Sequence, residues 1–177
     1  MYELSEEPEI SDEVKINLFA DNLPGISPED SISVLPFLTS ASFNKDTVIF
    51  TEGDVSDFIC FIVSGEVIVV KEDSQHLRFD SNYEHQIMSR LHKDQLFGEL
   101  AFLDELPRSA SAVAVSDTVI IKLDRDHFDK MREENPRLWG NIILSISKLV
   151  CARLRRSGGA LVDLRLSIDS ALSALAN

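Results

Sequence analysis

One stretch of the sequence combines a glycine, a carboxylate and an arginine in an order that could hold a phosphorylated ligand. It occupies residues 97–111 and reads Phe-Gly-Glu-Leu-Ala-Phe-Leu-Asp-Glu-Leu-Pro-Arg-Ser-Ala-Ser. Gly98 allows the backbone to approach a ligand closely. The amides of Glu99, Leu100 and Ala101 would be unpaired donors at the start of a short helix, where an anion is stabilised. The first half of the stretch therefore predicts an anion-binding turn.

The second half of the stretch places Arg108 and Ser109 directly after a proline. The guanidinium of Arg108 offers a planar pair of donors that fits two oxygens of a phosphate. Ser109 adds a hydroxyl and an amide on the same side. Glu99 would repel a phosphate, so its presence indicates hydrogen bonds to another part of the ligand, such as a sugar hydroxyl. Taken alone, Glu99 and Arg108 could instead form a structural ion pair that closes a turn.

Residues 97–111 resemble the phosphate-binding cassette of the cyclic nucleotide-binding domain family, through Phe-Gly-Glu-Leu-Ala and then Pro-Arg-Ser-Ala. Two further segments are similar to signatures of that family. Residues 43–53 match its glycine-bearing strand and turn, and residues 61–67 match its Phe-Ile-Val-Ser-Gly-Glu-Val strand pair. The resemblance extends over roughly residues 43–155 and not over the two ends.

The resemblance implies a role for each residue of the candidate site. Glu99 would hold the ribose 2′-hydroxyl, and Arg108 would hold the cyclic phosphate. Four positions would line the phosphate through backbone groups: Gly98, Leu100, Ala101 and Ser109. The implied ligand is cyclic AMP, with cyclic GMP as the second choice, and no cofactor or metal is implied.

The sequence departs from the family at three places that bear on the base. The turn before the cassette reads His-Lys-Asp-Gln at residues 92–95, where the family usually has a glycine. The last helix lacks a Thr-Ser pair that could bind adenine, and the helix predicted over residues 137–156 is about one turn longer than usual. These departures leave the choice between cyclic AMP and cyclic GMP open.

The pattern of short apolar runs predicts a mainly β fold with helices at both ends. The expected strands cover residues 47–50, 57–63, 66–70, 86–91, 112–115 and 118–123. Many short strands at this spacing favour a sandwich or a roll. We expect an antiparallel β-roll of the jelly-roll or double-stranded β-helix type. Ser64-Gly65 lies between two of these runs and predicts a two-residue hairpin. A polar loop is expected over residues 71–83.

Helical signals flank the roll. Ser27 is a predicted N-cap, and Asp124 is a predicted cap of a helix that continues to about residue 134. A longer helix over residues 137–156 should end at Gly158-Gly159. Beyond these glycines lies a heptad-like apolar seam formed by Leu161, Leu164, Ile168, Ala171 and Leu175. We expect this seam to pack on the roll or to pair with a second copy in a homodimer.

These signals divide the chain into three parts. An acidic N-terminal extension with a short helix covers residues 1–30, and a β-roll with its cassette at 97–111 covers residues 31–135. Residues 136–177 form C-terminal helices that would cover the ligand or mediate dimerisation.

Composition excludes several classes of function. The 177-residue chain has a net charge of −13, which disfavours nucleic-acid binding over most of its surface. Basic residues gather only between Lys148 and Arg165, which we interpret as a solvated helix face. No apolar run approaches the ~18 residues of a membrane span, and no secretory signal is present. Cys60 and Cys151 are interpreted as reduced core thiols, so a cytoplasmic location is expected.

Enzyme mechanisms lack the residues they need. The four histidines have no metal-type spacing, and no Ser-His-Asp or Cys-His arrangement has supporting context. We therefore expect a sensor without catalytic activity, whose ligand moves the C-terminal helices. Two alternatives remain open. The chain could be a ligand-free assembly module, or a regulatory domain of a longer protein, because no DNA-binding, kinase-inhibitory or channel segment is recognisable.

Overall fold

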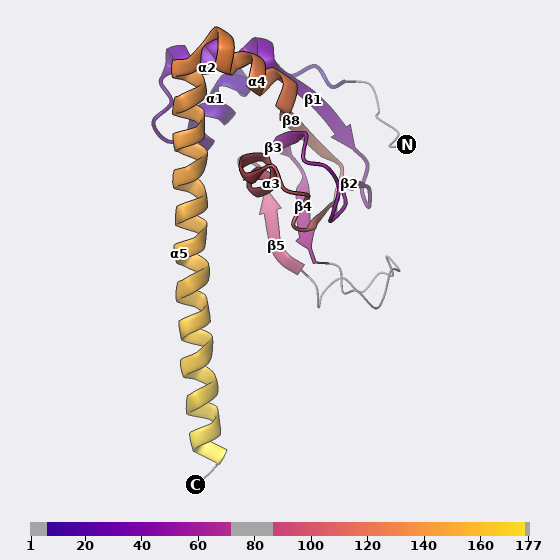
Figure 1. Ribbon diagram of the computed structural model, residues 1–177. Coiled ribbons are helices and arrows are strands. Elements are labelled where there is room, and N and C mark those ends of the chain that lie inside the picture. Colours follow the sequence, from indigo (N-terminus) through magenta and orange to yellow (C-terminus); the bar gives the residue numbers. More distant parts are fainter. Residues whose placement is uncertain (1–6, 72–86, 176–177) are drawn as a thin grey trace.

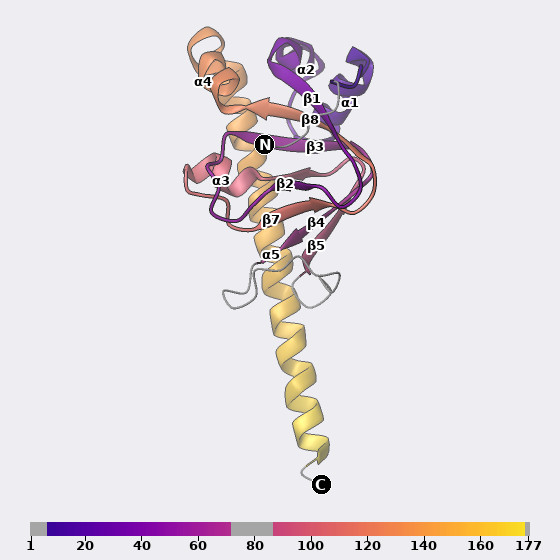
Figure 2. The ribbon, with the colours of Figure 1, turned by 90° about the vertical axis from the view of Figure 1, so that its right-hand side faces the viewer.

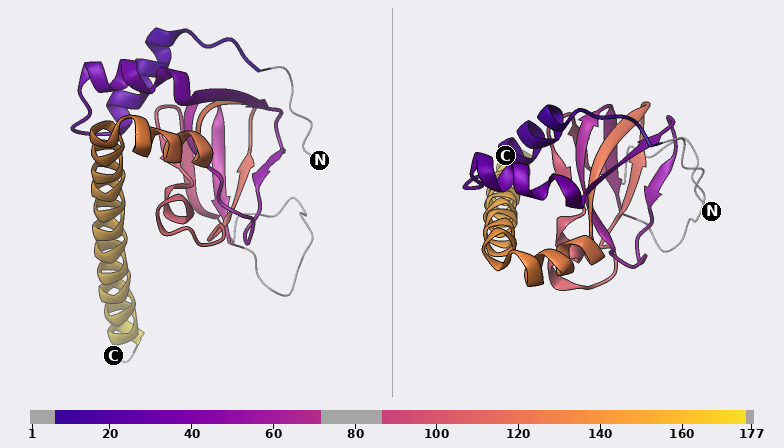
Figure 3. Two further views of the ribbon diagram at one scale, coloured as in Figure 1. Left: turned by 45° about the horizontal axis from the view of Figure 1, so that its top comes forward. Right: turned by 90° about the horizontal axis from the view of Figure 1, so that it is seen from above.

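The computed structural model describes residues 7–71 and 87–175 and has two antiparallel four-stranded sheets. The first sheet has the order β1 (Leu38–Phe43), β8 (Thr118–Asp124), β3 (Phe58–Ser64) and β6 (Leu96–Phe97). The second has the order β2 (Val48–Phe50), β7 (Ser111–Ala114), β4 (Glu66–Val70) and β5 (Ile87–His92). The two sheets face each other with helices beyond one of them (Figure 3). The predicted β-roll is therefore confirmed.

The turn at Gly65 connects the two sheets and does not form the predicted hairpin. β3 pairs with β6 and β8, whereas β4 pairs with β5 and β7. Gly65 adopts φ +94°, and a Cβ there would collide with Asp117 and Thr118. The hairpin prediction was wrong because two apolar runs joined by Ser-Gly fit a tight hairpin and a step between sheets equally well.

Helices α1 (Asp12–Asn22), α2 (Pro28–Val34) and α4 (Arg125–Glu134) lie at one end of the roll (Figure 1). A 3₁₀ turn, η1 (Leu35–Phe37), leads from α2 into β1. The Ser27 cap is confirmed, since its hydroxyl accepts from the Asp30 amide and the Asp30 carboxylate accepts from the Ser27 amide. Asp124 is at the N-cap of α4, but its side chain makes no cap hydrogen bond.

Helix α5 (Pro136–Leu175) runs through Gly158-Gly159 without a break. The predicted interruption was wrong, because a glycine inside a helix costs only about 1 kcal/mol and removes no backbone hydrogen bond. The 40-residue helix is about 60 Å long at 1.5 Å per residue. Its second half projects past the roll (Figures 1 and 2).

The two larger of three apolar clusters among the described residues stabilise the roll and the helices on it. One lies between the first sheet and the helices, and includes Phe19, Phe61, Phe128 and Ile142. The other lies between the two sheets; its members include Phe43, Phe50, Ile62, Phe97 and Ile120. Phe97, the first residue of the cassette, belongs to this second cluster, so the cassette starts from the packed interior of the roll.

The two cysteines differ in environment. Cys60 is buried, as predicted, and burial raises the pKa of its thiol. Cys151 is exposed on α5, so its interpretation as a core thiol was wrong. Three predicted features lie outside the described residues and side chains. They are the packing of the seam from Leu161 to Leu175, the chain at 1–6, and most of the loop at 71–83.

Candidate functional site

The cassette is a turn, one short helix and a return strand. β6 ends at Phe97, and Gly98 then adopts the left-handed conformation with φ +78°. Helix α3 (Glu99–Asp104) follows and ends at Glu105, which is also left-handed. The chain returns through Arg108 into β7. The structure thus brings Gly98 and Arg108 together, because a Cβ built on Gly98 would lie 2.8 Å from Nη1 of Arg108.

Arg108 is buried, with 3% of its surface exposed. Its guanidinium packs against two aromatic rings, with Cζ 4.1 Å from the centroid of Phe50 and 4.7 Å from that of Phe58. Nη1 donates to the Gly98 carbonyl at 2.9 Å, and Nη2 donates to the Phe58 carbonyl at 2.7 Å. These contacts fix the plane of the guanidinium and join the cassette to β3.

The charge of Arg108 has no anionic partner in the described part of the chain. No carboxylate lies within ion-pair distance there, and Nε is buried without an acceptor. Burial lowers the pKa of Arg108, which reflects the cost of keeping a cation away from water. A buried cation with an unused donor is a site where a bound anion would be strongly stabilised.

Backbone hydrogen bonds hold the turn before β3 against Arg108. The Arg108 amide donates to the Asp54 carbonyl at 2.8 Å, and the Gly53 amide donates to the Arg108 carbonyl at 2.9 Å. The carboxylate of Asp54 accepts from the Thr51 amide at 2.8 Å. The arginine is therefore positioned by Gly98 and by contacts along residues 50–58, which lie about 50 residues away in the sequence.

Glu99 is also buried, but its partner is Arg153 on α5. Arg153 donates through Nη1 to the Glu99 carboxylate and through Nη2 to the Leu96 carbonyl. Among the described residues there is no Glu99–Arg108 ion pair, so the structural alternative considered from sequence is wrong. The interpretation of the basic segment as a solvated face is likewise wrong at Arg153, whose side chain is 29% exposed.

The other predicted positions differ in accessibility. Ala101 is buried, whereas Leu100 and Ser109 are exposed. The carbonyl of Ser109 accepts from Nζ of Lys71 at 2.8 Å, and Lys71 also pairs with Glu52. Sequence reasoning did not identify Lys71, because it lies far from the cassette in the sequence and follows an ordinary strand.

A family model for the cyclic nucleotide-binding domain matches residues 40–135, which is more than half of the chain and includes the whole cassette. The chain belongs to the cyclic nucleotide-binding domain family. The resemblance found in the sequence is thereby confirmed.

Similar proteins agree with this assignment. The cAMP-dependent protein kinase regulatory subunit of Dictyostelium discoideum is 31% identical over 106 residues, which is 60% of this chain and 31% of that protein. A solved cyclic nucleotide-binding domain from Methylobacillus flagellatus KT has a TM-score of 0.71 at 25% identity, covering 85% of this chain and 82% of the other. The Thermus thermophilus catabolite activator protein has a TM-score of 0.63 at 28% identity, covering 83% and 62%.

The chain spans less than two thirds of the length of these curated relatives: 31% of the Dictyostelium subunit and 60% of a Thermus thermophilus cyclic AMP receptor protein. In the part of the chain that the structure describes, no helix combines the length and apolarity needed to cross a membrane. The same residues contain no group of three or more His, Cys, Asp or Glu placed to hold a metal ion.

Proposed function

We propose that the chain is a cyclic nucleotide sensor or regulatory domain that binds cyclic AMP, or cyclic GMP as a second choice, and performs no chemistry. The observation that carries this proposal is the buried guanidinium of Arg108, whose Nε has no acceptor among the described residues. A cyclic phosphate would supply the missing anion and the missing acceptor together. The Dictyostelium kinase subunit is named as cAMP-dependent and the Thermus protein as a cyclic AMP receptor, which supports cyclic AMP as the first choice.

Six residues of the cassette contact the ligand in this proposal. Arg108 binds the cyclic phosphate, and Glu99 accepts a hydrogen bond from the ribose 2′-hydroxyl. Backbone groups of four residues line the phosphate: Gly98, Leu100, Ala101 and Ser109. The position of Arg108, already fixed by two carbonyls and two rings, means that little ordering is needed when the ligand binds.

The route from ligand to the C-terminal helices begins at Glu99. In the structure the Glu99 carboxylate forms an ion pair with Arg153 of α5. A ribose hydroxyl at the same carboxylate would share or replace this contact, so ligand binding would change the free energy of the α5 position. Such a difference between two helix arrangements is what coupling requires.

Arg153→Met is expected to uncouple α5 from the ligand. It removes the ion pair with Glu99 and the bond to Leu96, and keeps a side chain of similar length. The affinity for cyclic AMP should change by less than about tenfold. The lost charge-assisted bonds contribute about 1.5–3 kcal/mol each, but they join two parts of the protein, so only a fraction of this free energy affects ligand binding. The ligand-induced change in hydrogen exchange of α5 amides should fall to background.

Arg155→Met is the matched control for this variant, because Arg155 lies two residues away on α5 and is exposed. It should transmit the ligand signal as the natural chain does. If Arg153→Met transmits the signal equally well, the route through Glu99 and Arg153 is wrong.

Glu99→Gln is expected to lower cyclic AMP affinity by about fivefold. The amide keeps an acceptor for the 2′-hydroxyl but loses the charge, and the two kinds of bond differ by about 1 kcal/mol. The 2′-deoxy nucleotide should bind the natural chain and the variant about equally in a calorimetric titration. If the deoxy nucleotide loses as much affinity as cyclic AMP does, Glu99 has no contact with that hydroxyl.

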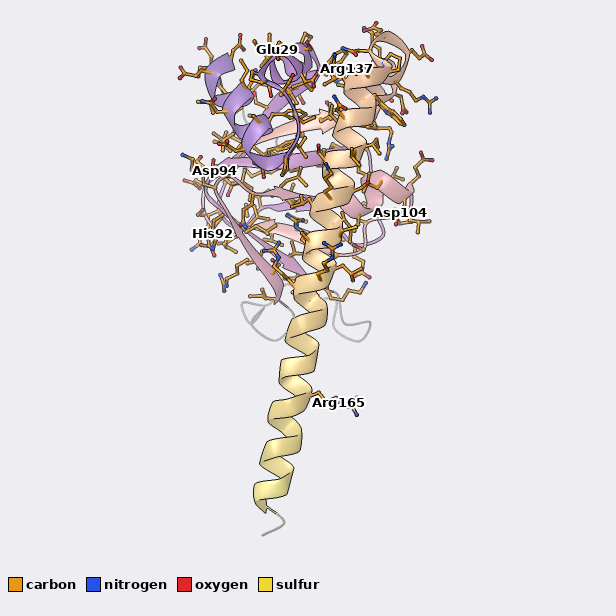
Figure 4. All side chains as sticks on the ribbon, turned by 90° about the vertical axis from the view of Figure 1, so that its left-hand side faces the viewer. Glu29, His92, Asp94, Asp104, Arg137 and Arg165 are labelled. Atoms are coloured by element: carbon orange, nitrogen blue, oxygen red, sulfur yellow. The ribbon has the colours of Figure 1, made fainter. Side chains whose placement is uncertain are left out.

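We also propose that α5 pairs with a second copy. Leu144 and Leu154 on this helix are 54% and 71% exposed. Figure 4 shows Arg165 on the part of α5 that stands clear of the roll. A helix with an apolar seam and no neighbour is stabilised when a partner covers it.

The full chain should sediment as a dimer, and a chain that ends at Gly158 should sediment as a monomer or a weaker dimer. Leu154→Glu should weaken the dimer, whereas Leu106→Glu, at a leucine that is 60% exposed on the cassette, should not. A monomeric full chain at all concentrations tested would contradict the pairing.

The alternative is a ligand-free assembly module on the same roll. The Glu99–Arg153 ion pair favours the module, because the Glu99 carboxylate already has a partner within the protein and does not need a ligand. Titration calorimetry with each cyclic nucleotide separates the two functions. Saturable binding of either nucleotide supports the sensor, and the absence of heat with both supports the module.

A further inference from the structure

A cavity of about 530 Å³ opens between the edge strands of the two sheets. β1 contributes Ala41 and Phe43, β2 contributes Ile49 and Phe50, and Phe58 and Lys122 come from β3 and β8. None of the residues that line it belongs to the cassette at 97–111. Its volume is in the range that holds a small organic ligand.

The walls of the cavity are apolar and held in place. Ala41, Phe43 and Ile49 are at most 8% exposed and belong to the cluster between the sheets. Phe50 and Phe58 pack edge to face, with centroids 6.1 Å apart. Both rings are stacked against the guanidinium of Arg108, which is not itself among the lining residues. The cavity is therefore preformed, which lowers the cost of binding.

Lys122 directs a cation toward this apolar space. It lies two residues after Ile120 on β8, and alternate residues of a strand face the same side. Ile120 packs between the sheets, so Lys122 faces the same interior near its open end. The Lys122 side chain is 22% exposed, and its Nζ lies 5.2 Å from the Phe58 ring centroid.

The ammonium of Lys122 is poorly satisfied. Its one ion-pair contact is the Asp124 carboxylate at 3.6 Å, and within the described ranges it donates no hydrogen bond. Asp124 is also shared, since it accepts from Thr39 Oγ1 at 3.1 Å and lies 3.5 Å from Nδ1 of His127. An ammonium has three donors, so Lys122 has donors to offer a ligand.

Two carboxylates at the mouth have other roles. Asp54 accepts from the Thr51 amide, and Asp57 is exposed to water. Both lie close enough to Arg108 to favour its charged form. Among the described residues neither carboxylate forms an ion pair with Arg108, and the cation that lines the cavity is the ammonium of Lys122.

We propose that this cavity is a second ligand site, for a small carboxylic acid with an aromatic or branched aliphatic body. The apolar body packs on Phe43, Ile49 and Phe50, and the carboxylate accepts hydrogen bonds from Lys122 Nζ. The site is separate from the cassette and does not depend on cyclic nucleotide binding.

The test uses 3-phenylpropionate as the probe and 3-phenylpropionamide as its uncharged counterpart, with the full chain labelled with ¹⁵N. Shifts caused by the acid should concentrate at residues 41–58 and 120–124, and saturating cyclic AMP should not abolish them. The affinity of the acid for Lys122→Met should be lower by a factor of about ten or more. This is the factor expected when a charge-assisted hydrogen bond is lost. The amide should bind both proteins equally and weakly.

Lys130→Met serves as the matched control, because Lys130 is a 62% exposed lysine on α4 that does not line the cavity. It should leave acid binding unchanged. Equal affinity of the natural chain for acid and amide would overturn the proposal. So would shifts centred on residues 98–109, or loss of the shifts with cyclic AMP. If Lys122→Met does not fold, the shift map and the comparison of acid with amide decide the question.

Discussion

Arg108→Ala is expected to weaken cyclic AMP binding by at least tenfold to a hundredfold. The contact between a guanidinium and a phosphate contributes about 1.5–3 kcal/mol, and each 1.4 kcal/mol corresponds to a factor of ten. Removal of the arginine would also leave a partly buried phosphate without a counter-charge. Titration calorimetry of both proteins measures this loss directly.

The same substitution should lower the free energy of unfolding by about 2–4 kcal/mol, because two buried carbonyls lose their charged donor. These are the carbonyls of Gly98 and Phe58, and the rings of Phe50 and Phe58 also lose the cation that packs against them. Binding must therefore be measured well below the melting temperature of the variant.

Two further variants show whether this effect is specific. Arg108→Lys keeps the charge but cannot make a two-pronged contact, so it should recover only part of the affinity. Arg90→Ala removes an arginine that is 51% exposed and pairs with Glu66 on the surface, and it should change affinity little. If Arg108→Ala binds cyclic AMP as tightly as the natural chain, Arg108 has a structural role alone.

Gly98→Ala is expected to weaken binding by at least tenfold, although it adds a single methyl group. That methyl would lie 2.8 Å from Nη1 of Arg108, so the guanidinium must shift from its position against Phe50 and Phe58. The positive φ of +78° adds strain of roughly 1–2 kcal/mol for any residue with a Cβ. A calorimetric titration and a melting curve separate the effect on binding from the effect on stability.

Gly53→Ala is the matched control for the strain. Gly53 has φ +86°, and a Cβ there would meet no atom within 4 Å. This variant should lose similar stability to backbone strain but keep most of its affinity. Equal losses of affinity in both variants would show that strain in the roll, rather than the position of Arg108, controls binding.

The β-roll and the place of the cassette could be predicted from the sequence because their signals are local. Alternating apolar runs identify strands, and the order Gly, Glu, then Pro-Arg-Ser identifies the cassette within fifteen consecutive residues, 97–111. The step between sheets at Gly65 could not be predicted, since strand pairing depends on partners far away in the chain. β3 pairs with residues of β8 near position 120, not with its neighbour in sequence.

The partner of Glu99 could not be predicted for a similar reason. Arg153 lies 54 residues away, among other basic residues that are exposed. Only the path of α5 beside α3 distinguishes it from Arg155 and Arg156. The burial of Arg108 against two phenylalanines could not be predicted either, because those rings come from β2 and β3 and from no recognisable motif.

Calorimetric titration of the full chain with cyclic AMP, beside 5′-AMP as an uncyclised control, tests directly whether the cassette binds a cyclic nucleotide. We expect saturable binding of cyclic AMP, markedly weaker binding of 5′-AMP, and a raised melting temperature. At a hundredfold excess of ligand over its dissociation constant, the added stability should be about 2.7 kcal/mol. If neither cyclic AMP nor cyclic GMP produces binding heat or a shift in melting temperature, the claim that this cassette binds a cyclic nucleotide is wrong.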